Sequence, residues 1–255
     1  MTVIAVFNQK GGVGKTTTAI NLAAALQLRG RNAYGVDLDP QAQFSTVAGV
    51  TARSGAETVL SVFQHSRLLR TLIQETPSGL HIVPAHIELS KVDSQYGKGY
   101  NVVNRLAAVL HAEQLGGADS PLLIDCSPLI GVLSLNALFA CGGLVVPISA
   151  DHLSFKAALQ IERALKALEP VLKRRIKRRY LLTRFDTRRR MAWDILHMAQ
   201  ERFGDEVCRT RIAENVSLAE SPALNKTVFE HAPRSSGARD YDELLDELLD
   251  SGFIE

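Results

Sequence analysis

The stretch Asn8-Gln9-Lys10-Gly11-Gly12-Val13-Gly14-Lys15-Thr16-Thr17 stands between a short apolar run, Val3 to Phe7, and a segment with apolar residues at helical spacing, Thr16 to Arg29. Backbone N–H groups of a Gly-rich loop at a helix N-terminus bind phosphate, because the donors converge and the helix dipole favours negative charge. Lys15 would reach the β- and γ-phosphates of a nucleotide, and the Thr16 hydroxyl would bind Mg²⁺. We therefore expect a phosphate-binding loop made of Gly11, Gly12, Val13, Gly14, Lys15, Thr16 and Thr17.

Five further apolar runs, rich in β-branched residues, follow the first one along the chain. They are Ala33 to Leu38, His81 to Pro84, Leu122 to Asp125, Leu144 to Ile148 and Tyr180 to Thr183. Such runs are typical of strands buried on both faces, and segments between them, such as Phe155 to Leu168, have helical spacing. This alternation predicts a three-layer α/β fold of the P-loop NTPase type: a mostly parallel central sheet with helices on both faces.

The 255 residues contain no long linker rich in Pro, Gly and Ser, so we expect a single domain over 1–255. Gly30 is predicted to end the first helix in a left-handed conformation. Residues 51–80 and 91–121 have weaker patterns, and the polar segment Asp93 to Gly99 is expected to be a mobile surface loop.

Three acidic residues follow or close two of the predicted strands. Asp37 and Asp39 lie at the end of the second run, and Asp125 closes the run that begins at Leu122. Ligands gather at the carboxyl ends of strands in open α/β sheets. One carboxylate there can hold Mg²⁺, and a second can orient an attacking water. A lone Asp at a strand end is more often a helix cap or a turn residue, but three beside a phosphate loop favour a metal and water site.

Most phosphate loops have Gly where Gln9 stands, whereas here Lys10 is followed by two glycines. KGGVGKTT resembles the deviant Walker A motif of the ParA/MinD family of ATPases. Further similar segments lie at 21–23, 146–148, 183–186, 215–222 and 233–238, so that the resemblance covers nearly the whole chain. The nearer resemblance is to ParA/Soj partition ATPases without an N-terminal DNA-reading domain, because the loop begins at residue 9 or 10.

The resemblance implies an ATPase that uses ATP and Mg²⁺ and forms a homodimer when ATP is bound. It implies that Lys10 reaches the nucleotide bound to the partner, that Asp39 positions the attacking water and that Asp37 supports the site. Thr16 and Asp125 would hold Mg²⁺, and Thr183 and Pro222 would lie near the adenine. A ParB-like or adaptor protein would stimulate the weak hydrolysis, and the ATPase would move a DNA or protein cargo.

A basic segment runs from residue 173 to residue 190 and contains a single acid, Asp186. Its basic residues are Lys173, Arg174, Arg175, Lys177, Arg178, Arg179, Arg184, Arg188, Arg189 and Arg190. Such a cluster is typical of binding to a nucleic-acid backbone, and the alternative is a solvated surface. Tyr180 and Phe185 are the segment's only aromatic residues, too few to stack a run of bases, so duplex is favoured over single strands.

The resemblance implies that double-stranded DNA binds without sequence preference at the segments Asp186 to Arg190 and Ile212 to Pro222. Glu214 and Ser217 stand where Soj-like proteins commonly have Arg. The predicted DNA-binding residues are therefore Arg184, Arg188, Arg189, Arg190, Lys173, Arg174, Arg175 and Arg178.

The formal net charge of +2 averages this basic segment against an acidic terminal one, which has seven acids from Asp240 onward. Leu244, Leu245, Leu248 and Leu249 give that end an apolar helical face without the Lys and Arg of a membrane anchor. We expect a packed terminal helix.

No apolar run is long enough to span a membrane, and three cysteines without metal-binding spacing fit a reducing compartment. The prediction is a cytoplasmic protein, associated with the nucleoid and not with a membrane.

The alternatives are relatives of the same fold that do not bind DNA. A MinD-like membrane ATPase is disfavoured by the acidic terminal segment. An iron–sulfur reductase needs cysteines in a cluster loop, and neither Cys126 nor Cys141 lies in one. An amide-forming ligase remains open, and a non-catalytic scaffold is disfavoured because every expected catalytic position is occupied.

Overall fold

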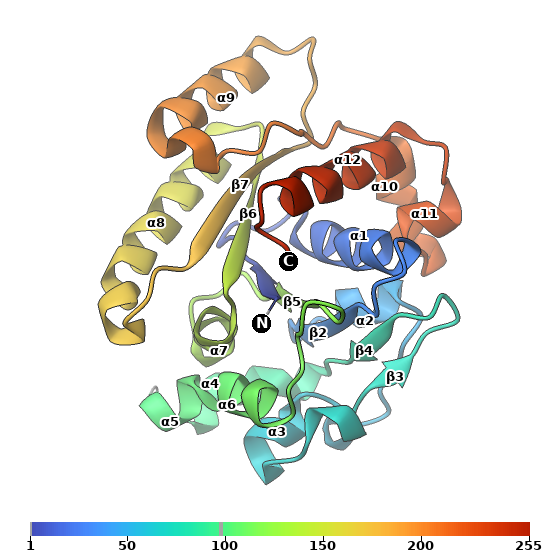
Figure 1. Ribbon diagram of the computed structural model, residues 1–255, viewed down its shortest axis with the longest axis vertical. Helices are drawn as coiled ribbons and strands as arrows, with labels where there is room; N and C mark the ends of the chain where they lie inside the picture. The colour runs from blue at the N-terminus through green and yellow to red at the C-terminus, as the bar shows by residue number, and fades with distance from the viewer. Residues whose placement is uncertain (1, 97–98) are drawn as a thin grey trace.

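The computed structural model describes residues 2–96 and 99–255 and contains a seven-stranded sheet of order β3-β4-β2-β5-β1-β6-β7 (Figure 1). The strands are β1 (Val3–Val6), β2 (Tyr34–Leu38), β3 (Gln74–Glu75), β4 (His81–Val83), β5 (Leu122–Cys126), β6 (Gly143–Ser149) and β7 (Lys177–Thr183). Only β3 pairs antiparallel in this sheet. All six predicted strands are confirmed, whereas the two residues of β3 are too few to give a sequence pattern.

Helices cover both faces of the sheet (Figure 1). The α-helices are α1 (Lys15–Leu28), α2 (Gln43–Val47), α3 (Leu60–His65), α4 (Val92–Gln95), α5 (Tyr100–Val103), α6 (Arg105–Ala112), α7 (Val132–Ala140), α8 (His152–Leu172), α9 (Arg190–Phe203), α10 (Val216–Glu220), α11 (Val228–His231) and α12 (Ser236–Asp250). Short 3₁₀ helices are η1 (Gly55–Glu57), η2 (Leu69–Thr71), η3 (Ile87–Lys91), η4 (Gly204–Glu206) and η5 (Ser221–Leu224). Gly30, with φ 75°, ends the first helix in the predicted left-handed conformation.

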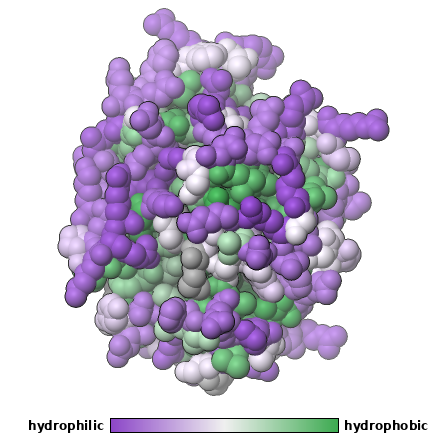
Figure 2. Space-filling view, viewed as in Figure 1, coloured by the Kyte–Doolittle hydropathy of each residue, from purple (hydrophilic) through white to green (hydrophobic). Residues whose placement is uncertain are grey.

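Two hydrophobic cores lie on the two faces of the sheet. Alternate residues of β1 contribute to each, with Val3 and Ala5 in one core and Ile4 and Val6 in the other. The first core lies beneath α6, α7, α8 and α9, and the second beneath α1, α2 and α12. Strands buried on both faces confirm the three-layer prediction. The outer surface in the view of Figure 2 is mainly hydrophilic.

The acidic terminal segment forms the predicted packed helix. Leu244, Leu245 and Leu248 of α12 are buried in the core shared with α1. On the outside, Arg29 of the α1 end pairs with Asp242 at 2.8 Å. None of the helices described is long and apolar enough to cross a membrane.

The prediction of a surface loop from Asp93 to Gly99 is wrong for its first part. Residues 93–95 belong to α4, and the Asp93 carboxylate accepts a hydrogen bond from the Val132 amide at 2.6 Å. Residues 97 and 98 lie outside the described residues. Because α4 is a single turn held by a contact from a distant segment, local sequence patterns could not indicate it.

Candidate nucleotide-binding site

The predicted site residues converge at the carboxyl edge of the sheet, around a cavity of about 840 Å³. The loops after β1, β2, β5 and β7 contribute to its wall. Predicted residues that line it are Gly11, Gly12, Gly14, Lys15, Thr16, Thr17, Asp39, Thr183 and Pro222. Sequence segments as far apart as Gly11 and Pro222 therefore form one site, as expected for an open α/β sheet.

The loop after β1 has a conformation that requires two of its glycines. Gly12 and Gly14 have φ values of 73° and 88°, a left-handed region that side chains other than Gly rarely adopt. Gly14 caps α1, and its carbonyl accepts from the Thr18 amide at 2.8 Å. Backbone N–H groups at this helix start are left for an anion.

Asn8, which the sequence analysis did not single out, fixes the start of this loop. It is fully buried, donates from Nδ2 to the Pro147 carbonyl at 2.7 Å and accepts from the Lys10 amide at 3.0 Å. The loop is thereby tied to β6, the neighbour of β1 in the sheet. The sequence feature that could have indicated this role is a polar residue directly after a predicted buried strand.

Lys15, Thr16 and Asp125 form the centre of the site. The Thr16 hydroxyl donates to Asp125 Oδ2 at 2.7 Å, while Lys15 Nζ donates to the Lys10 carbonyl at 3.1 Å. Asp125 is fully buried, and its Oδ1 has no hydrogen-bond partner among the residues that the structure describes. Burial, and then the charge of Asp37, raises the pKa of Asp125. A buried carboxylate oxygen beside a threonine hydroxyl is a donor set that suits Mg²⁺.

Asp37 acts on the chain that follows β2. Its carboxylate accepts from the Ser45 amide at 2.9 Å, the Ser45 hydroxyl at 2.7 Å and the Asp39 amide at 3.0 Å. Burial raises the pKa of Asp37 to about 6, although these hydrogen bonds oppose that shift. Asp37 thus bonds to the chain that follows β2, whereas Asp39 itself is half-buried and lines the cavity.

Lys10 is held by a carboxylate of its own chain. Its Nζ lies 2.8 and 2.7 Å from the two carboxylate oxygens of Asp151, which also caps α8 through the Ser154 amide at 2.9 Å. Burial alone would raise the pKa of Asp151, but hydrogen bonds from Lys10, Ser149 and Ser154 lower it below its ordinary value. Asp151 was not predicted from the sequence, although it lies just beyond the carboxyl end of β6, as Asp39 lies just beyond β2.

Thr183 and Pro222, the predicted adenine neighbours, lie on the cavity wall beyond the phosphate loop. The Thr183 hydroxyl donates to the Val13 carbonyl at 2.9 Å, which joins the end of β7 to the loop. Arg184 lines the same cavity with a left-handed φ of 51°. Its prediction as a DNA-binding residue is therefore less favoured than a place in the nucleotide site.

The basic segment is divided by β7, so that it does not form one surface. Lys173 to Arg175 precede the strand and Arg184 to Arg190 follow it, and a seven-residue strand spans about 20 Å. Arg178 was predicted to bind DNA, but its side chain is only 4% exposed and pairs with Glu169. The alternation of side chains along β7 turns it into the protein, which removes it from the candidate surface.

Acids within the segment after β7 partly neutralise its arginines. Asp186 accepts from Arg188 Nε at 2.9 Å and pairs with Arg189 at 3.2 Å, while Glu214 lies 3.6 Å from Arg189. The hydrogen bond from Arg188 lowers the pKa of Asp186 to about 2. Arg190 is the most exposed of these residues, at 94%, and its nearest acid lies 4.0 Å away.

A glycine-rich phosphate loop opening α1, with its threonine bonded to a buried acid at the end of a parallel strand, defines a P-loop nucleoside triphosphatase. A protein-family model described as an AAA domain matches residues 1–178. The chromosome-partitioning ATPase Soj of Thermus thermophilus is 36% identical, over 96% of this chain and 94% of the relative. The chromosome partitioning protein ParA of Caulobacter vibrioides is 31% identical, over 97% and 93%. The chain belongs to the ParA/Soj family of chromosome-partitioning ATPases.

A solved structure outside the partition proteins is also similar. It is cobyrinic acid a,c-diamide synthase of Mycobacterium smegmatis with bound ADP and magnesium, at 28% identity and a TM-score of 0.83. The similarity covers 98% of this chain and 94% of the other. The predicted fold class and family are thus confirmed, whereas the individual site residues stay predictions.

Proposed function

We propose that this chain is a partition or positioning ATPase, in which one domain over residues 1–255 binds ATP and Mg²⁺ at the carboxyl edge of the sheet. The observation that supports this most strongly is the contact between Thr16 and Asp125 Oδ2, since it leaves the other carboxylate oxygen buried and without a hydrogen-bond partner among the described residues. The similar structure with ADP and magnesium supports the same ligands.

Each site residue has a distinct task in this proposal. Thr16 and Asp125 would hold Mg²⁺, which supplies charge neutralisation at the phosphates. Lys15 binds the β- and γ-phosphates, and Asp39 accepts a hydrogen bond from the attacking water and orients it. Asp37 holds Asp39 and Ser45 in place and does not touch the nucleotide.

In the ATP state, two chains would form a homodimer in which Lys10 reaches the nucleotide of the partner. The dimer would bind double-stranded DNA without sequence preference through Arg188, Arg189 and Arg190, and thereby associate with the nucleoid. A ParB-like or adaptor protein would stimulate hydrolysis and release the dimer. Soj and ParA, relatives named for chromosome partitioning, support this cycle.

The test of DNA binding is a titration of duplex DNA with ATP, with ADP and without nucleotide, across a salt series. We expect the duplex to bind only when ATP is present. In Arg190→Ala, the slope of log affinity against log salt concentration should fall in magnitude by about 1 per chain. Lys173→Ala is the matched control, because this exposed lysine lies before β7 at the other end of the strand. Equal binding without nucleotide would exclude an ATP-gated DNA surface.

The likeness to the diamide synthase favours a second candidate function, ATP-dependent amide formation. Such a ligase must activate a carboxylate substrate beside the γ-phosphate, and its ATP turnover should require that substrate. Hydrolysis that rises with duplex DNA and a partition partner, without any added carboxylic acid, would favour the positioning ATPase.

A further inference from the structure

A short segment, residues 86–95, joins three parts of the chain around the nucleotide cavity. It comprises η3 and α4, and two of its side chains, Ile87 and Ser90, line the cavity wall. Each end of the segment is fixed by a carboxylate that bonds to backbone of another segment. None of the sequence segments that carry the family resemblance includes these contacts.

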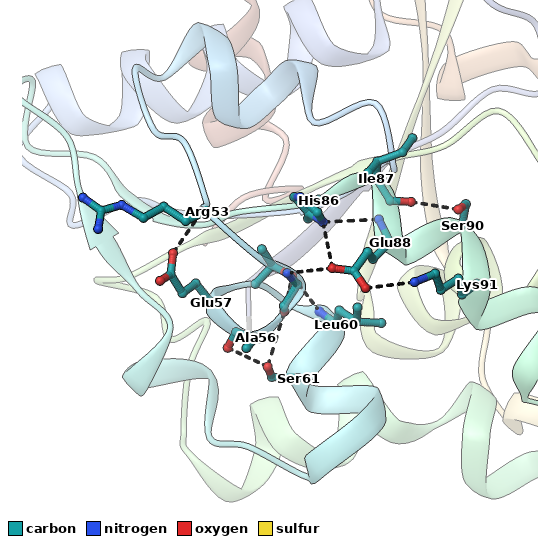
Figure 3. A network of polar contacts seen from close by, with 12 residues as sticks. Arg53, Ala56, Glu57, Leu60, Ser61, His86, Ile87, Glu88, Ser90 and Lys91 are labelled. Atoms are coloured by element: carbon teal, nitrogen blue, oxygen red, sulfur yellow. Dashed lines mark hydrogen bonds and ion pairs between the residues drawn. The ribbon is translucent and has the colours of Figure 1, made fainter.

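The first carboxylate is that of Glu88, and Figure 3 shows it among its partners. It accepts from the Gly55 amide at 3.3 Å and pairs with Lys91 Nζ at 3.0 Å. A Cβ on Gly55 would approach Leu60 at 2.6 Å and Glu88 at 3.2 Å, so the two segments are in close contact. The start of the 86–95 segment is therefore fixed on η1 and α3.

The second carboxylate is that of Asp93, and it bonds to the start of α7. Asp93 Oδ1 accepts from the Val132 amide at 2.6 Å. A Cβ on Gly131 would lie 2.1 Å from the same oxygen, so a larger residue at this position would displace the Asp93 carboxylate. Gly131 has an ordinary extended φ of −146°, so the obstacle to a side chain here is the Asp93 carboxylate and not the backbone conformation.

The loop between Asp125 and this contact also lines the cavity. Ser127, Pro128 and Leu129 line the cavity, and Leu129 is 72% exposed. The loop has one end at the buried acid of β5 and the other at the helix start that Asp93 holds. An ordinary helix cap comes from the residue just before the helix. Here the cap comes from a segment 39 residues earlier that itself lines the cavity.

We propose that Asp93 is a positioning residue for nucleotide hydrolysis: by bonding to the Val132 amide, it holds the loop 127–130 and the 86–95 segment together as one wall. This rests on the proposed ATPase function. Without the bond, the helix start at Val132 loses an acceptor, and the loop after Asp125 gains freedom. Nucleotide affinity should change little, because the hydrogen bond of Asp93 is to the start of α7 and not to the phosphate loop.

The test compares Asp93→Ala with Asp93→Asn in single-turnover hydrolysis, nucleotide affinity and hydrogen exchange. Loss of a helix-capping acceptor corresponds to about a fivefold change. We expect the hydrolysis rate of Asp93→Ala to fall about fivefold with less than a twofold change in nucleotide affinity. Exchange of the amides at 129–133 should rise by a similar factor in the nucleotide-free chain. Asp93→Asn keeps an acceptor oxygen and should restore both.

Two further variants separate positioning from general destabilisation. The Ser235 hydroxyl caps α12 by accepting from the Ala238 amide at 3.2 Å. Ser235→Ala removes this cap and should leave the hydrolysis rate and the exchange at 129–133 unchanged. Gly131→Ala drives a methyl group into Asp93 and should reproduce the defect, while Gly131→Ala with Asp93→Ala should be no worse than either alone.

The proposal is overturned if Asp93→Ala matches the wild type in exchange at 129–133, or if Ser235→Ala shows the same loss of hydrolysis. It is also overturned if Asp93→Asn is as defective as Asp93→Ala. A wild-type chain that binds nucleotide but never hydrolyses it would instead refute the proposed ATPase, and the exchange data would still decide whether Asp93 holds the loop.

Discussion

Replacing Asp151 with Asn should make the ATP-dependent dimer tighter. Lys10 Nζ lies within 2.8 Å of both carboxylate oxygens of Asp151 in the same chain, so this ion pair must break before Lys10 can reach a partner's nucleotide. Asn at position 151 removes the charge but keeps an oxygen that can accept from the Ser154 amide, as Asn is also a good helix cap. The variant therefore releases Lys10 and preserves the start of α8.

The size of the effect follows from the exposure of the pair. The side chains of Lys10 and Asp151 are 31% and 32% exposed, so solvent screens them and the pair contributes about 1 kcal/mol. A symmetric dimer breaks two such pairs, which amounts to about 2 kcal/mol. The dissociation constant of the dimer should then fall roughly 30-fold.

The assay is sedimentation velocity with ATP, in an Asp39→Ala background that is expected to prevent turnover. Asp151→Asn should shift the monomer–dimer transition to lower protein concentration. In a chain that also carries Lys10→Ala, the same substitution should have no effect, because there is no lysine to release. An unchanged or weaker dimer in Asp151→Asn, with α8 intact by circular dichroism, would refute the reasoning.

Three other predictions concern stability and the basic surface. Burial raises the pKa of Asp37 from 3.8 to about 6, so the unfolded chain loses this proton at a lower pH than the folded chain does. The free energy of unfolding should therefore fall by about 3 kcal/mol as pH rises from about 4 to 6. The fall should be smaller in Asp37→Asn. Arg178→Ala leaves Glu169 unpaired and should lower the free energy of unfolding by about 3 kcal/mol without changing the salt dependence of DNA binding. Gly35→Ala places a methyl group 2.5 Å from the Phe44 ring and should cost about 1–3 kcal/mol in urea unfolding.

Each of these predictions has a contradicting result. Identical pH profiles of urea unfolding for wild type and Asp37→Asn would remove Asp37 as the source of the pH dependence. A reduced salt slope in Arg178→Ala, measured by DNA titration, would place Arg178 on the DNA surface. A second change, Phe44→Leu, should recover part of the loss in Gly35→Ala, and no recovery would mean that the ring is not the obstacle.

Local patterns predicted the elements that form the centre of the site. The phosphate loop is continuous in sequence, and its glycines determine its conformation. Asp37, Asp39 and Asp125 were found because parallel strands bring their carboxyl ends to one edge. These inferences needed only the order of strands and helices, which hydrophobic periodicity determines over a few residues.

Contacts between distant segments were not predictable in this way. Asn8 bonds to Pro147, 139 residues later, and Lys10 to Asp151, 141 residues later. The prediction that the basic segment forms one surface was wrong for the same reason. The charges counted in the sequence do not reveal that the Arg178 side chain points into the protein. Side-chain pairing depends on the register of strands, and one residue of shift reverses the face.

The site is electrostatically unfavourable without a ligand, which suits a chain that responds to nucleotide. Asp37 and Asp125 are paired in register on β2 and β5, both fully buried, and burial raises the pKa of each. Burial also lowers the pKa of Lys15, against the opposing charges of Asp125 and Asp39. A metal ion would complement the two acids, and phosphate would complement the lysine. A ligand that binds only the folded state adds its binding free energy to the stability of that state. The buried charges that destabilise the free chain are therefore the same groups through which bound nucleotide and metal would stabilise it.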